Sequence, residues 1–541
     1  MSLLATQPGY WAFVVVAFAG MLWQFRRGSN RTYIAASAIT MFALRWPTIV
    51  VVDPFIDESQ MIAQAITAAR YPIPWKDFDG TTSGPLNTYA LLLPRLFGFS
   101  ISWRQSRVVA ALLVLVIVIA FNDSLRRLYG NTIARGATIV LVVLYGAASS
   151  TDLVQYASEL LSIALLAIAL NCTVSLAMVR EQASRISFIG GLCCGSVPFA
   201  KLQATPLAAM LAGSLAVVIV VNRARNESIK RSLAALAGGV LAVAAVILPV
   251  VAVSGAFRDF FTSYIAQAVA SLQGPRLGLD AALSVPEFKM FFATTAISIV
   301  VLGVLFFALV LRGMIARGVP SDLPRRAALP FSFVFLMVAF YAIQTPHRPY
   351  AHYMLLMLMP FLLVLVSLIG TLRQQYPQSS TILISLLAAY VIAISGQLLG
   401  HAYSTRDSSF LSRVRNGTGI ARDAVASKIA EIAPPGARVA IWGYAPYLYV
   451  SSQMVMGTRD SISQFAILPG PYRDYYRRRF LDDLMRNRPA LFVDAIAPGQ
   501  FGLTDRGADG FEQFPELAQH IRTSYVLVDE VRGVRIFSRK D

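Results

Sequence analysis

Over its first 400 residues the chain alternates long apolar runs with short polar breaks. A helix that rises about 1.5 Å per residue needs roughly 20 apolar residues to cross the hydrocarbon layer. Twelve runs predict such helices, near residues 9–25, 33–52, 107–122, 136–150, 157–178, 187–201, 204–222, 233–253, 290–312, 328–344, 350–370 and 380–400. Gly and Pro in GGLCCGSVPFAKLQATP predict a broken or re-entrant pair at 187–222. The pattern is that of a polytopic α-helical membrane protein.

The pattern changes after residue 400. Apolar runs shorten to strand length in RVAIWG, ALFVDA, YVLVDEV and GVRIFSR, and helical patterns lie between them at 473–488 and 514–522. Alternating strands and helices predict a small α/β domain. We therefore expect a transmembrane domain over 1–400 and an α/β domain over 401–541.

Basic residues gather in alternate loops, which are the inside loops by the positive-inside rule. They are Arg26, Arg27, Arg31, Arg126, Arg127, Arg135, Arg180, Arg185, Arg223, Arg225, Lys230, Arg231, Arg312, Arg317, Arg325, Arg326 and Arg373. The opposite, outer side receives segments 53–106, 254–289 and 345–350 and everything after residue 400. We expect a multi-pass protein of a bacterial cytoplasmic membrane with its C-terminal domain in the periplasm.

Composition supports the membrane class. Hydrophobic residues make up 56% of the 541 residues, charged residues 14%, and the mean hydropathy is +0.59, against about 45–50% and 25% in soluble proteins. The net charge of +18 follows from the inside loops, which argues against nucleic-acid binding. The three cysteines lie in apolar runs and form neither a disulfide framework nor a metal motif.

The first outer loop, 53–106, combines carboxylates with apolar surface. ESQMIAQAITAAR and TYALLLPRLFG predict helices lying at the membrane surface. Asp57 and Glu58 follow a spanning run, and Asp77 and Asp79 come later in the loop. Such acids either cap a helix or frame a site at the lipid–water border, where a carboxylate can take a proton from a hydroxyl.

Cationic residues that can hold a phosphate are expected on the same side. Lys201 lies inside the broken apolar stretch, where a charge is costly and therefore marks a functional residue unless it snorkels to the interface. His347, Arg348 and His352 precede a spanning run; Arg348 can bind phosphate bidentately or anchor the interface. Glu159, near the outer end of another run, either faces the cavity or caps its helix.

Four stretches together resemble the GT-C type of polyprenyl-phosphate-sugar-dependent membrane glycosyltransferases. That group includes family 39 protein mannosyltransferases, lipid A aminoarabinose transferases and rhizobial lipopolysaccharide galacturonosyltransferases. The stretches are DESQMIAQAITAA, WKDFDGTTSGPLNTYALLLPRLFG, PFAKLQATPLA and HRPYAHYMLLMLMP. IWGYAPYLYVSSQMVMGTRD also resembles the opening of the outside domain in alphaproteobacterial members.

The resemblance implies inverting transfer of a sugar from a polyprenyl-phosphate donor to a lipid, polysaccharide or protein acceptor. Asp57 matches the family's catalytic carboxylate, with Glu58 its neighbour. Lys201 and the segment holding Arg348 and His352 match positions that bind the lipid phosphate. Thr81-Thr82-Ser83-Gly84-Pro85 stands where many relatives have Lys-Pro-Pro, so the loop lacks the family's usual lysine.

Two other classes compete with the enzyme. A transporter or flippase of lipid-linked sugars also suits broken helices, but no pseudo-symmetric halves are visible. A non-catalytic scaffold would explain the altered Lys-Pro-Pro position, yet the chain keeps the acids and cations together. The expected partners are the donor, the acceptor and membrane lipids. No cofactor is indicated and no metal-ligand cluster stands out, although a divalent cation could bridge phosphate and carboxylates.

Overall fold

The structure, a computed structural model, describes residues 7–51, 54–178, 182–221, 229–273, 283–311, 323–346, 350–415 and 423–540. The chain divides into two compact units. The first unit comprises Met1–Val51, Ala110–Ala245 and Gly274–Thr418. The second comprises Val52–Val109, Val246–Gln273 and Gly419–Asp541.

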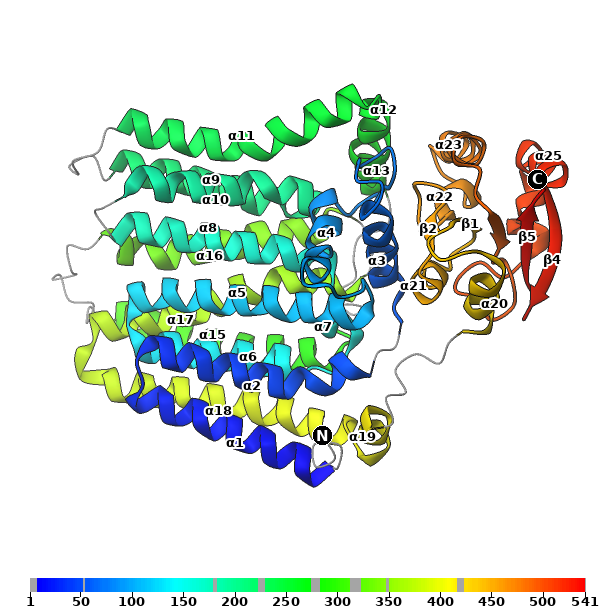
Figure 1. Ribbon diagram of the computed structural model, residues 1–541. Helices are drawn as coiled ribbons and strands as arrows, with labels where there is room; N and C mark the ends of the chain where they lie inside the picture. Colours follow the sequence, from blue (N-terminus) through cyan, green and yellow to red (C-terminus); the bar gives the residue numbers. More distant parts are fainter. Residues whose placement is uncertain are drawn as a thin grey trace. The chain divides into compact units, whose positions relative to one another are not determined.

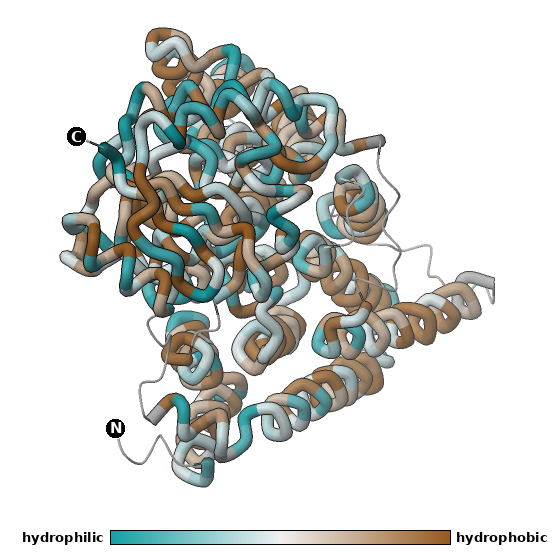
Figure 2. Tube along the Cα trace, turned by 90° about the vertical axis from the view of Figure 1, so that its right-hand side faces the viewer, coloured by the Kyte–Doolittle hydropathy of each residue, from teal (hydrophilic) through white to brown (hydrophobic). Residues whose placement is uncertain are grey.

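The first unit is a bundle of long apolar helices, two of which, α5 (Trp103–Tyr129) and α11 (Ile229–Val253), have one end in the second unit. Each of the twelve predicted runs coincides with one of these helices (Figure 1). They are α1 (Gln7–Arg27), α2 (Asn30–Val50), α5 (Trp103–Tyr129), α6 (Asn131–Ala147), α8 (Ser158–Met178), α9 (Ala183–Ala200), α10 (Thr205–Val221), α11 (Ile229–Val253), α15 (Pro286–Leu311), α16 (Leu323–Gln344), α17 (Leu355–Gln375) and α18 (Ser380–Thr405). In the described part of the chain, ten helices are long and apolar enough to cross a membrane. Figure 2 shows the apolar residues along them. The predicted fold of a polytopic helical protein is confirmed.

Burial orders the helices within this bundle. The apolar window of the segment Ala351–Gln375 is 89% buried, whereas that of α1 is only 17% buried. α17 is therefore a central helix and α1 a peripheral one whose apolar side chains suit contact with lipid. Short elements complete the unit: α7 (Thr151–Val154), η3 (Leu202–Ala204), η6 (Ala351–Met354), η7 (Pro377–Ser379) and α19 (Ser408–Arg415).

A buried arginine, Arg406, joins the ends of several of these helices. Arg406 donates to the Leu44 carbonyl and to the Tyr10 hydroxyl with Nη1, and to the Gly146 and Ala148 carbonyls with Nη2. Helix ends leave carbonyls without an internal partner, and a guanidinium supplies several donors at once. This contact positions the turn that follows α6 and leads into α7.

The C-terminal part of the second unit contains the predicted α/β fold. Its sheet has the order β2-β1-β3-β5-β4, parallel across β2, β1 and β3 and antiparallel across β3, β5 and β4. The strands are β1 (Arg438–Trp442), β2 (Val455–Met456), β3 (Leu491–Asp494), β4 (Tyr525–Val531) and β5 (Val534–Arg539). The four strand predictions are confirmed, and two-residue β2 is additional.

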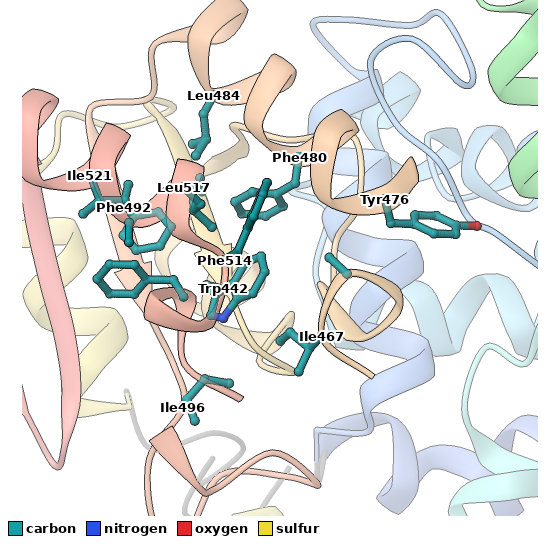
Figure 3. Packing of buried hydrophobic residues seen from close by; sticks show 14 of the residues in the cluster. Trp442, Ile467, Tyr476, Phe480, Leu484, Phe492, Ile496, Phe514, Leu517 and Ile521 are labelled. Carbon is teal, nitrogen blue, oxygen red and sulfur yellow. The ribbon is translucent and has the colours of Figure 1, made fainter. Parts of the chain in front are cut away.

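Helices cover this sheet around an aromatic core. Figure 3 shows Trp442, Phe480, Phe492 and Phe514 packed together, all of them buried. The helices of this part are α20 (Ala424–Ile432), α21 (Tyr447–Ser452), α22 (Gln464–Ile467), α23 (Arg473–Asn487), α24 (Arg506–Asp509), η8 (Phe511–Gln513) and α25 (Pro515–Ser524). α23 and α25 match the helices predicted at 473–488 and 514–522.

Two shorter segments of the chain belong to the same unit. The predicted first outer loop, 53–106, contains α3 (Ile56–Ala68), α4 (Pro85–Ala90) and η2 (Leu93–Phe97). The predicted second outer loop, 254–289, contains α12 (Phe257–Asp259), the π-helix η4 (Phe260–Ala266), α13 (Gln267–Ala270) and η5 (Ser271–Gln273). α3 is buried along nearly its whole length, including Ile62 and Ala65 at 0% exposure. By contrast, Leu96 and Phe97 are 78% and 77% exposed, a few residues before α5 begins.

Candidate functional site

The break predicted near Lys201 is present, and it turns the lysine into the bundle. α9 contains Pro198 and ends at Ala200; Lys201 is extended (φ −149°, ψ 112°), and α10 starts at Thr205. The side chain of Lys201 is buried, at 4% residue exposure. A buried ammonium requires acidic or polar partners, so its surroundings define the first candidate site.

Lys201 pairs with the start of α8. Its Nζ lies 3.0 Å from Glu159 Oε1 and donates to Ser158 Oγ at 2.8 Å. The same nitrogen lies 5.5 Å from the centre of the Tyr353 ring, within the range of a cation–π contact. Glu159 itself is fully buried, so its charge is balanced by the lysine.

His352 joins this pair from η6, just before α17. Its Nδ1 lies 3.5 Å from Asp152 Oδ1 and its Nε2 lies 4.0 Å from Glu159 Oε1. The imidazole stacks on Tyr350, with ring centres 5.5 Å apart and an interplanar angle of 12°. Asp152 lies on α7, which Arg406 helps to position. Lys201, Glu159, His352 and Asp152 therefore form one cluster, which we call the lysine cluster.

Polar atoms without partners accompany the lysine cluster. Among the described residues, Gln155 Oε1 and Ser162 Oγ are buried and make no hydrogen bond. The same is true of the nitrogen and the oxygen of the Gln203 side-chain amide. Ser162 follows Glu159 by three positions and so lies on the same face of α8. An unsatisfied buried polar group costs about 1–3 kcal/mol, and a polar ligand would remove that cost.

The acidic pair of the first outer loop splits into two environments. Glu58, at 0% exposure, accepts a hydrogen bond from Ser106 Oγ at 2.6 Å and pairs with Arg107 at 3.4 Å. Asp57 is half-buried in the first turn of α3 and accepts from Gln60 Nε2 at 3.2 Å. Glu58 thus fastens α3 to the start of α5, and Asp57 is the more accessible carboxylate.

Asp77 and Asp79, the two later acids of the loop, accept hydrogen bonds from backbone amides of its turns. Asp77 Oδ2 accepts from the Ile73 amide at 3.1 Å. Asp79 is 3% exposed, accepts from the Thr81 amide at 2.8 Å and pairs with Arg479 of α23 at 2.8 Å. Both therefore have partners inside the second unit.

The predicted residues are only partly brought together. Lys201, Glu159 and His352 meet in the first unit, whereas Asp57, Glu58, Asp77 and Asp79 belong to the second. His347 and Arg348 lie outside the described residues. The meeting of Asp57 with Lys201 and Arg348 stays a prediction.

Sequence reasoning missed several partners of these residues. Asp152 precedes the predicted spanning run at 157–178 and Ser158 lies at its start, and that position was the only signal that pointed to them. Arg107 and Arg479 gave no signal, because their partners lie about 50 and 400 positions away. Within the described residues, no group of three or more His, Cys, Asp or Glu side chains is arranged to hold a metal ion.

Comparison by sequence finds no matching family profile and no matching curated protein. Comparison by structure finds ArnT from Cupriavidus metallidurans bound to undecaprenyl phosphate, at a TM-score of 0.54 and 13% identity, with 94% of this chain and 98% of that chain covered. ArnT in the apo state matches at 0.52 and 14%, with the same coverage. The chain has the GT-C fold, in a multi-pass membrane protein.

Proposed function

We propose that the chain is an inverting glycosyltransferase that moves a sugar from a polyprenyl-phosphate-linked donor to a lipid, polysaccharide or protein acceptor. The observation that carries the proposal is the lysine cluster, a buried cation at a helix break, with unsatisfied polar atoms on nearby residues of the same segments. The fold shared with a protein that binds undecaprenyl phosphate adds support.

Lys201 suits the departing phosphate. An ammonium has three donors, and the described contacts use two of them, on Ser158 and Glu159. The third N–H would donate to an oxygen of the phosphate, and such a charge-assisted hydrogen bond is strong. His352, and Arg348 of the same segment, would add positive charge, and Glu159 would keep Lys201 oriented.

The proposed reaction is a single displacement at the anomeric carbon. Asp57 takes the proton of the acceptor hydroxyl, or orients that hydroxyl, while the hydroxyl oxygen bonds to the anomeric carbon. The bond from this carbon to the phosphate oxygen breaks, and its electron pair leaves with the polyprenyl phosphate. Lys201 stabilises the negative charge that develops on the leaving group. Attack from the face opposite the phosphate inverts the configuration.

The organisation that goes with this function is also a proposal. Residues 1–400 form the transmembrane catalytic domain, and residues 401–541 form a periplasmic domain that helps to select the acceptor. The reaction takes place at the outer face of the cytoplasmic membrane.

The test uses two variants with matched controls. Lys201→Met is expected to weaken binding of undecaprenyl phosphate to the purified full-length protein by about tenfold or more, since a hydrogen bond to a charged group is worth about 1.5–3 kcal/mol. Lys230→Met, at an exposed lysine, is expected to bind as the wild type does. Binding is measured by native mass spectrometry.

Asp57→Asn is expected to abolish modification of envelope lipids or glycans when it replaces the wild-type gene, and the exposed Asp482→Asn is expected to leave modification intact. Mass spectrometry of the extracted envelope lipids and glycans measures the modification. Undiminished transfer by Asp57→Asn would overturn the role of that residue. Movement of a lipid-linked sugar across proteoliposomes with no glycosidic bond broken would favour the flippase.

A further inference from the structure

Two buried arginines join three distant segments of the second unit. Arg459 Nη1 donates to the Trp75 carbonyl at 2.8 Å and to Asp259 at 2.7 Å. Its Nε and Nη2 grip Asp483 at 2.9 and 2.7 Å. Residues of the first outer loop, the second outer loop and the C-terminal part thus meet on one guanidinium.

Arg479 makes the second junction. Its Nη1 donates to Asp79 Oδ2 at 2.8 Å and to the Tyr475 hydroxyl at 3.1 Å, and its Nε and Nη2 bind the Asp460 carboxylate. Arg479 is 4% exposed, and Asp79 and Asp460 are 3% and 6% exposed. We call Arg459, Arg479 and the aspartates Asp79, Asp259, Asp460 and Asp483 the arginine lock.

The arginine lock reaches α3 through Asp79. The Asp79 amide donates to the Arg459 carbonyl at 2.8 Å, so main chain and side chain are both fixed. The Asp79 carbonyl accepts from Gln64 of α3 at 3.3 Å. Further along the helix, Thr67 Oγ1 accepts from the Met456 amide at 3.1 Å. α3 is therefore held by the C-terminal part, and Asp57 lies in its first turn.

We infer that Arg479 is a positioning residue, which sets the orientation of α3 through Asp79 and thereby presents Asp57 to the acceptor. This inference rests on the proposed function of Asp57. It gives the C-terminal α/β part a share in the chemistry, since the residues that hold α3 come from β2, the turn after it and α23. Arg479 touches no reacting atom and acts only through the loop.

Replacing Arg479 with a neutral side chain distinguishes a role in positioning α3 from a role in folding the α/β part. In Arg479→Met the two carboxylates lose their shared cation, so the 77–83 turn and α3 loosen while the aromatic core around Trp442 and Phe492 stays packed. The matched control is Arg478→Met, which removes the neighbouring exposed arginine of the same helix, whose Nε donates to the Asp474 carbonyl.

The experiment measures hydrogen exchange of the full-length proteins in nanodiscs. Arg479→Met is expected to speed exchange of the 58–68 and 77–83 amides about tenfold through easier local opening, with wild-type exchange in β1 and β3. Wild-type exchange in α3 of Arg479→Met would overturn the inference. Arg479→Lys keeps the charge but cannot span both carboxylates as a fork, so an intermediate effect is expected.

A second readout distinguishes positioning from general damage. Arg479→Met is expected to bind undecaprenyl phosphate as the wild type does while losing modification of the envelope by about tenfold or more, because only the carboxylate that meets the acceptor is misplaced. Loss of both together, at a lowered unfolding temperature, would overturn the positioning role. Wild-type protein that fails to bind undecaprenyl phosphate would instead refute the proposed donor.

Discussion

Lys201 and Glu159 show how an ion pair is tolerated within an apolar bundle. Removing charges from water costs several kcal/mol per ion unless hydrogen bonds and opposite charge compensate. Here Ser158 and His352 supply part of that compensation. The pair lies at the break between α9 and α10, where Lys201 is extended. Both residues were candidates from the sequence alone, but their pairing follows only from the fold.

Asp460 is a second residue whose charge depends on its neighbours. Burial raises its pKa from the ordinary 3.8 to about 7; Arg479 and Arg459 oppose the shift, and the carboxylates of Asp79 and Asp483 reinforce it. A raised pKa means that the folded protein holds the proton more tightly than the unfolded chain. The stability it contributes is complete below about pH 4 and is lost as the pH rises through about 7.

We therefore expect the unfolding temperature of the purified protein to fall between pH 5.5 and pH 8. The free energy of unfolding falls by at most about 1.4 kcal/mol per pH unit from this group. In Asp460→Asn, which cannot titrate, the dependence is expected to flatten. Differential scanning fluorimetry at matched ionic strength measures both slopes. An unchanged slope in Asp460→Asn, with Asp482→Asn as control, would assign the titration to another group.

At the scale of elements, the packing of α9 against α11 depends on glycine. A Cβ at Gly195 would lie 2.0 Å from the Val240 carbonyl oxygen, and one at Gly191 would lie 2.3 Å from that of Leu236. Small residues that let helix backbones approach are typical of membrane interfaces. α9 ends at the break that carries Lys201, so this contact also holds the helix that leads into the lysine cluster.

Gly195→Ala is expected to lower the free energy of unfolding by about 1–3 kcal/mol, as overpacking of a well-packed interface does. Gly213→Ala in α10, where a Cβ meets no atom within 4 Å, is expected to be neutral or stabilising because alanine favours helix. Thermal unfolding in one detergent compares the two variants. Equal stability of both would contradict the close packing of α9 on α11.

Element types were predictable from sequence because their periods are local. The twelve apolar runs and the strands at RVAIWG, ALFVDA, YVLVDEV and GVRIFSR correspond to observed elements. The surroundings of α3 were not predictable, because an apolar face packs equally well against lipid or protein; α3 is buried in the second unit. The partners Arg107 and Arg479 could not be predicted either, because contacts between distant segments leave no periodic pattern in the sequence.

At the scale of the whole molecule, the charge pattern predicts which side each part faces. The three native cysteines are buried, so an introduced cysteine reports without background. We expect Arg478→Cys to react with a membrane-impermeant maleimide in cells whose outer membrane alone is permeabilised. Arg26→Cys, at the end of α1, is expected to react only after the inner membrane is opened. The opposite pattern would invert the topology and place the C-terminal domain in the cytoplasm.

The arginine lock also has a consequence for how the chain is made. Asp79 and Arg479 are separated by 400 positions. A ribosome that adds about 5–20 residues per second therefore delivers the arginine about 20–80 s after the aspartate. During that interval the nascent first loop waits without its permanent partner while the intervening helices are inserted. α3 therefore reaches its final contacts with the C-terminal part only after most of the chain has been synthesised.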